Sequence, residues 1–168
     1  MKRVDGRFPA GDPDASRVSK PISGHEHFGV ALAAAQEGLA EGGVPIGAAL
    51  VLGGEVLAVG RNRRIQQGDP TAHAEIDCLR QGGRGIAYPD GILISTLAPC
   101  MMCSGAIVQF GIPRVLVGEA TNFAGELEFL RSRGVDVEVL DDQQATQMMA
   151  EFIAGRPTLW NEDIGVFG

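Results

Sequence analysis

The sequence predicts an α/β fold in which a mixed β-sheet is covered by helices on both faces. Short apolar stretches alternate with helical patterns along most of the 168 residues, and strands joined through helices pair in parallel. The Gly53-Gly54 pair separates two apolar stretches, 47–52 and 55–59, and such a link is typical of a tight antiparallel hairpin. The sheet should therefore contain both kinds of pairing.

Periodicity and end signals predict the other elements. Thr71 suits the N-cap of a helix, and Pro99 suits the first position of another. Apolar residues recur at helical spacing from His25 to the Gly42-Gly43 pair. We expect helices over residues 25–41, 72–81, 99–110, 126–133 and 143–154, strands over 92–96, 114–117 and 135–140, and a polar loop over 61–70.

Composition predicts one globular domain in a reducing compartment. Residues 1–24 form a polar tail that we expect to be partly flexible, and no linker or repeat divides residues 25–168. The net charge of −7 repels phosphate backbones and anionic membranes, so no nucleic-acid or membrane partner is expected. Neither a signal peptide nor a membrane-spanning run is recognisable, and three cysteines make a poor disulfide framework. We expect a cytoplasmic protein.

Two short motifs supply the residues of a zinc site. His73-Ala74-Glu75 and Pro99-Cys100-x-x-Cys103 both fall at predicted helix starts, and Cys100 and Cys103 share one helical face. Catalytic zinc takes three protein ligands and leaves a fourth position for water. We expect His73, Cys100 and Cys103 to bind Zn²⁺. Glu75, two residues from His73 and off its helical face, is expected to move protons beside the water. This split pattern is a known signature of zinc-dependent base deaminases.

Other interpretations of the same residues remain. A Cys-x-x-Cys pair can be a redox centre, which predicts a reducible disulfide and a metal-free protein. A zinc-binding module without activity would have no use for Glu75 beside the metal. Cys78 lies on the helix of His73, but unpaired cysteines are usually small core residues, and we expect it in the core.

The chain resembles the cytidine deaminase superfamily, and within it the fungal-type cytosine deaminases, from about residue 25 to the C-terminus. Besides the zinc motifs, the resemblance rests on residues 41–47, 111–114, 117–119 and 122–123, on Asn62, and on the ending 156–165. It implies a three-layer α-β-α fold with a mixed five-stranded sheet, and a homodimer. It also implies a C-terminal segment that closes the pocket. The fungal enzymes have His-Gly-Glu, whereas this chain has His-Ala-Glu, as in guanine and tRNA adenosine deaminases.

The resemblance also implies the site residues. Glu75 would be the catalytic acid and base, and His73, Cys100 and Cys103 the zinc ligands. Asn62 and the backbone N–H of Ala74 would bind the 2-oxo group of the base, and Asp163 would accept from its exocyclic amine. The walls of the slot would be Phe123, Trp160, Ile46 and Leu97.

We therefore expect hydrolytic deamination of a free nucleobase, cytosine to uracil plus ammonia, in pyrimidine salvage. The alternative substrates are other small amino-bearing rings, namely guanine, isocytosine or creatinine. A tRNA adenosine deaminase is disfavoured by the charge of −7.

Overall fold

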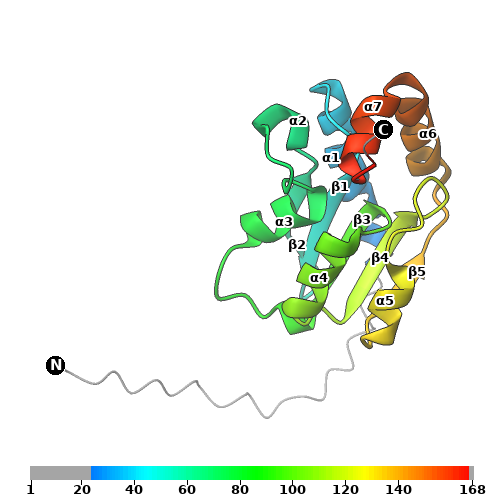
Figure 1. Cartoon of the computed structure of the whole chain (residues 1–168). Coiled ribbons are helices and arrows are strands. Elements are labelled where there is room, and N and C mark those ends of the chain that lie inside the picture. Colours follow the sequence, from blue (N-terminus) through cyan, green and yellow to red (C-terminus); the bar gives the residue numbers. More distant parts are fainter. Residues whose placement is uncertain (1–23, 167–168) are drawn as a thin grey trace, which may run out of the picture.

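The computed structural model describes residues 24–166, which alternate between strands and helices (Figure 1). The strands are β1 (Gly47–Leu52), β2 (Glu55–Arg61), β3 (Gly91–Leu97), β4 (Arg114–Glu119) and β5 (Asp136–Val139). The α-helices of this described part are α1 (Phe28–Ala40), α2 (Arg64–Gln67), α3 (Ala74–Gly82), α4 (Met101–Gln109), α5 (Leu127–Ser132), α6 (Gln143–Gly155) and α7 (Pro157–Asp163). Two short 3-10 helices, η1 (His25–His27) and η2 (Tyr88–Asp90), precede α1 and β3.

The five strands form one mixed sheet in the order β2-β1-β3-β4-β5. β1 pairs antiparallel with β2 and with β3, whereas β3 with β4 and β4 with β5 are parallel. The turn between β1 and β2 is the Gly53-Gly54 pair, and both glycines have positive φ, 61° and 88°. The predicted mixed five-stranded sheet is confirmed.

Helices cover both faces of the sheet because its strands alternate their side chains. In β1, Ala48 and Leu50 belong to the core cluster that includes residues of α3, α4 and α5. The intervening Ala49 and Val51 belong to a second cluster, with Phe28 of α1. α1 therefore lies on one face, and α3, α4 and α5 lie on the other (Figure 1). The three-layer architecture that the resemblance implied is confirmed.

Close approach of one helix to the sheet requires a glycine. A Cβ at Gly60 in β2 would overlap the backbone of Ala74 and Cys78 in α3. Only glycine lets the two backbones come this near. Because α3 begins directly after His73, this contact determines where that side chain lies above the sheet.

Several boundaries differ from the predictions. The expected loop over 61–70 contains α2, whose four residues are too few to show an amphipathic period. The next helix begins at Ala74 instead of Ala72, because Thr71 donates both its backbone N–H and its hydroxyl to Asp69 in a turn. α4 begins at Met101, two residues later than expected. No helix was predicted over residues 157–163, where α7 lies.

Two further predictions from the sequence concern the N-terminal tail and membrane-spanning helices. The predicted tail, residues 1–24, lies outside the described residues except for Gly24. None of the helices within residues 24–166 combines the length and the apolar character needed to cross a bilayer.

Candidate active site

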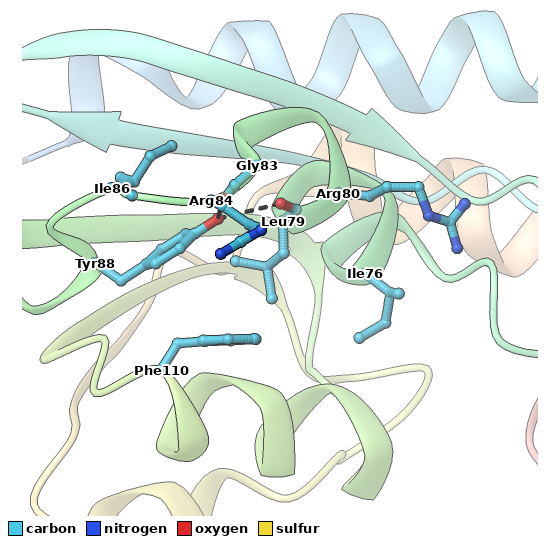
Figure 2. A pocket seen from close by; sticks show the side chains of 9 residues that line it. Ile76, Leu79, Arg80, Gly83, Arg84, Ile86, Tyr88 and Phe110 are labelled. Carbon is cyan, nitrogen blue, oxygen red and sulfur yellow. Dashed lines mark hydrogen bonds between the residues drawn. The ribbon is translucent and has the colours of Figure 1, made fainter. Parts of the chain in front are cut away.

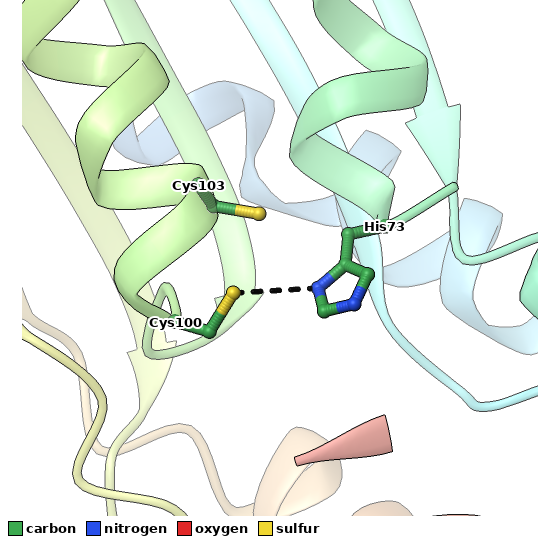
Figure 3. Close-up of side chains that lie close together, drawn as sticks. All are labelled: His73, Cys100 and Cys103. Atoms are coloured by element: carbon green, nitrogen blue, oxygen red, sulfur yellow. Dashed lines mark hydrogen bonds between the residues drawn. The ribbon is translucent and has the colours of Figure 1, made fainter. Parts of the chain in front are cut away.

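Three metal-binding side chains meet where α3 and α4 begin (Figure 3). His73 is the N-cap residue of α3, Cys100 is the N-cap residue of α4, and Cys103 lies in the first turn of α4. One ligand atom from each of the three lies within 4.8 Å of the other two. Within residues 24–166 this is the one cluster of its kind. The fold thus brings together two motifs that are 27 residues apart in the chain.

The donor set of this cluster fits zinc. One imidazole and two thiolates are ligands that zinc prefers, and three protein ligands are the number found at catalytic zinc sites. Sγ of Cys100 lies 3.5 Å from Nδ1 of His73. The third cysteine, Cys78, does not join them: it is fully buried and its thiol donates to the carbonyl O of Ala58 at 3.5 Å. Cys78 is a core residue, as expected.

Electrostatics at the cluster favour one thiolate. Hydrogen bonds from the Cys103 thiol and from His73 lower the pKa of Cys100 to about 4, against the effect of burial. The pKa of Cys103 is raised well above its usual value, because its proton is held between Cys100 and Glu75 in a buried position. Burial lowers the pKa of His73, but the neighbouring Cys100 and carboxylates outweigh it and the net shift is upward.

Glu75 lies beside the cluster, in the first turn of α3, and is almost completely buried. Its Oε2 accepts from the thiol of Cys103 at 3.3 Å, and its Oε1 accepts from the hydroxyl of Ser95 at 3.0 Å. Burial raises the pKa of this carboxyl group above its usual value. Two hydrogen bonds hold the side chain in one orientation, next to the metal-binding atoms.

A small cavity lies over the cluster, with a volume of about 20 Å³. Its walls come from the residue before β1, the end of β3, the starts of α3 and α4, the loop after β4, and the end of α7. Most of the expected site residues line it: Ile46, His73, Glu75, Leu97, Cys100, Phe123, Trp160 and Asp163. The rings of Phe123 and Trp160 meet edge to face, with centroids 5.8 Å apart and an interplanar angle of 84°. Cys103, Asn62 and Ala74, the other three expected site residues, are fully buried and do not line the cavity.

Asn62 belongs to a polar network that reaches α7. Its Oδ1 accepts from the backbone N–H of Arg64 at 3.1 Å, and its Nδ2 donates to Oδ1 of Asp163 at 3.0 Å. Because a backbone N–H can only donate, the amide oxygen must face Arg64 and the NH₂ group must face Asp163. Nη1 of Arg64 pairs with the same carboxylate oxygen at 2.9 Å.

The structure adds site residues that sequence reasoning missed. Ala98 and Ile164 line the cavity, Ser95 supports Glu75, and Arg64 pairs with Asp163. Strand alternation could have found Ser95, since it shares a face of β3 with Leu97. No local signal marks Arg64, because its partner lies 99 residues further along the chain.

Comparison with known proteins agrees with this site. Residues 23–119 match the model of the cytidine and deoxycytidylate deaminase zinc-binding region. The chain is 43% identical to the cytosine deaminase of Candida albicans over 139 residues, which cover 81% of this chain and 93% of that protein. The chain belongs to the zinc-dependent cytidine deaminase family.

Solved structures of deaminases share the fold. One, from a study of A-to-I editing by tRNA:A34 deaminases at the wobble position of transfer RNA, is 32% identical with a TM-score of 0.65, covering 73% of this chain and 99% of that one. The guanine deaminase from Nitrosomonas europaea is 20% identical with the same TM-score, covering 92% of this chain and 100% of that one. At this identity the second likeness concerns the fold alone.

The cysteines should differ in reactivity when zinc has been removed. At pH 7 we expect iodoacetamide to alkylate Cys100 much faster than Cys78. The half-buried Cys100 has a pKa of about 4 and is a thiolate, whereas burial raises the pKa of Cys78 to about 12 and keeps it a thiol. Timed labelling with peptide mass spectrometry measures both rates. Added zinc should slow the labelling of Cys100, and equal rates for the two cysteines would contradict this assignment.

Proposed function

We propose that this zinc-dependent deaminase acts on a free nucleobase and converts cytosine and water into uracil and ammonia. The observation that carries the proposal is the small cavity that Asp163 and Glu75 both line. A carboxylate that only accepts hydrogen bonds suits an exocyclic amine, and the apolar walls suit a flat ring. The 43% identity to a cytosine deaminase supports the same substrate.

His73, Cys100 and Cys103 are the zinc ligands in this proposal. When bound, zinc would supply the Lewis acid that makes water a nucleophile at neutral pH. The thiolate of Cys100 is already favoured, whereas Cys103 must give up its proton when the metal enters. Glu75, whose Oε2 accepts that thiol hydrogen bond, lies where it can take the proton.

Glu75 then carries protons between water and substrate. Its carboxylate takes a proton from the attacking water and delivers it to N3 of cytosine. After the oxygen has bonded to C4, Glu75 delivers the second proton to the departing amine, so that ammonia leaves and the 4-oxo group of uracil remains. The raised pKa of Glu75 is the direction that an acid and base working near neutral pH requires.

The residues that line the site would fix the orientation of the cytosine ring. Asn62 has its NH₂ group turned toward the site, so it can donate to the 2-oxo group, with the N–H of Ala74 as a second donor. Asp163 would accept from the amine. Phe123, Trp160, Ile46 and Leu97 would enclose the ring and exclude bulk water. The reaction would place the protein in pyrimidine salvage in the cytoplasm, with no nucleic-acid or membrane partner.

Replacing Glu75 tests its role. Glu75→Gln keeps the shape and the hydrogen bond from Ser95 but cannot carry protons, so turnover of cytosine should fall by about a hundredfold to ten-thousandfold. Zinc content, measured by elemental analysis, should stay at one per chain. Ammonia release close to that of the wild type would refute the assignment of Glu75.

A second candidate is a tRNA adenosine deaminase, which the 32% identity to a tRNA deaminase structure favours. The net charge of −7 and the 43% identity to a cytosine deaminase over most of both chains favour the free base instead, because an acidic protein repels the phosphates of an RNA. We expect ammonia release to be fastest from cytosine in a screen with guanine, isocytosine, creatinine and cytidine. Inosine formed in an anticodon stem-loop, or activity on cytidine without activity on cytosine, would reverse this ranking.

An uncovered apolar face supports the homodimer. A hollow of about 620 Å³ lies between the end of α3, the following loop and the end of α4 (Figure 2). Ile76, Leu79 and Phe110 line it, and Met101, Met102 and Phe110 are exposed along and just after α4. Exposed apolar patches of this kind are typical of interfaces.

The assembly can be tested with two matched variants. Light scattering should give twice the mass of one chain for the wild type. Phe110→Glu should give one chain mass, because it puts a charge into the proposed interface. Leu57→Glu is the matched control, because Leu57 is about as exposed as Phe110 (47% against 46%). It should remain a dimer, because Leu57 lies on β2, outside the proposed interface. A monomeric wild type, or equal effects of the two variants, would contradict this interface.

A further inference from the structure

The cavity can admit a base only if one of its walls moves. Its volume of about 20 Å³ holds roughly one water molecule and is too small for a pyrimidine ring. Ile46, Leu97 and Ala98 lie at the ends of β1 and β3, and His73, Glu75 and Cys100 lie at the starts of α3 and α4. The other walls are Phe123, in the loop after β4, and the C-terminal segment, with Trp160 and Asp163 of α7 and Ile164 directly after it.

α7 is attached by a few apolar side chains and by a polar network. Trp160 is the one buried residue of this seven-residue helix, where it meets Phe123, and the partly buried Leu159 and Ile164 also pack against the core. The polar attachment reaches one short segment. Asn62 and Arg64 bind Asp163, and Nη2 of Arg64 also lies 3.4 Å from both the carboxylate and the backbone carbonyl O of Glu162. Outward movement of α7 must break these bonds.

Arg64 is unusual for an arginine on a short surface helix. Its side chain is only 9% exposed, and that of Asp163 is 4% exposed. None of the residues of α2 counts as core, so packing does not explain why a guanidinium is held inside. If one partner of such a deeply buried ion pair is removed, the charge of the other partner stays buried without an opposite charge beside it. The pair therefore favours the closed position of α7.

We propose that Arg64 is a positioning residue that latches α7 over the cavity and holds Asp163 at the substrate position. One guanidinium ties two successive residues of α7, and the neighbouring backbone N–H orients Asn62 at the same time. Arg64 thus couples closure of the cavity to the placement of both polar groups that would read the base. The effect on catalysis rests on the proposed function, whereas the latch itself does not.

The single tryptophan of the chain reports the latch directly. Trp160 lies on α7 and is 6% exposed, so acrylamide quenching of its fluorescence measures how often α7 opens. We expect Arg64→Gln to raise the quenching constant severalfold, without any base present, at unchanged circular dichroism. Arg63→Gln is the matched control, because Arg63 is the adjacent arginine but pairs with Asp77 of α3, and it should quench like the wild type.

Kinetics provide the second readout. Arg64→Gln should raise KM for cytosine about tenfold with kcat nearly unchanged, the pattern of lost binding contacts. Quenching of Arg64→Gln equal to that of the wild type, or an equal rise in Arg63→Gln, would overturn the latch. If Arg64→Gln does not fold, Arg64→Lys decides: quenching above the wild type supports the latch, and wild-type quenching overturns it. Increased quenching in a protein that deaminates no base would leave the latch standing and refute the proposed function.

Discussion

The site depends on two helices that begin close together above one sheet. α4 follows β3 directly, and α3 packs on β2 so closely that only Gly60 fits beneath it. The N-cap residues of these two helices are His73 and Cys100. Any shift of α3 relative to the sheet would separate the imidazole from the thiolates. The metal site is therefore a consequence of backbone packing before it is one of side-chain chemistry.

The buried carboxylates near the cavity all accept hydrogen bonds from neighbouring groups. Glu75 accepts from a hydroxyl and a thiol, and Asp163 accepts from an amide and a guanidinium. Glu119, fully buried at the end of β4, accepts from the backbone N–H groups of Thr121 and Asn122 and from the side chain of Asn122. That last set organises the loop that presents Phe123 to Trp160. Satisfied carboxylates thus place the apolar walls as well as the polar groups.

The cavity combines residues inside the family match with residues beyond it. The family match ends at residue 119, with the zinc ligands and Glu75 inside it. Phe123, Trp160 and Asp163 lie beyond that match and complete the cavity. In the proposed function, residues of both regions therefore contact the base: Asn62 lies inside the match and Asp163 lies beyond it.

The sequence by itself determined the mixed sheet, its hairpin and the residues of the zinc motifs. Each of these has a local signal: short apolar stretches between helical patterns, a Gly-Gly turn, or a spacing of two or three residues. Two helix starts were predicted two residues too early, because Thr71 and Pro99 suit turns next to a helix as well as its first residues. Strand alternation could place Ser95 on the same face of β3 as Leu97, but only the tertiary structure decided that it bonds to Glu75 and that Arg64 pairs with Asp163. Contacts across 20 and 99 residues leave no periodic trace in the chain, since they are made by the packing of separate elements.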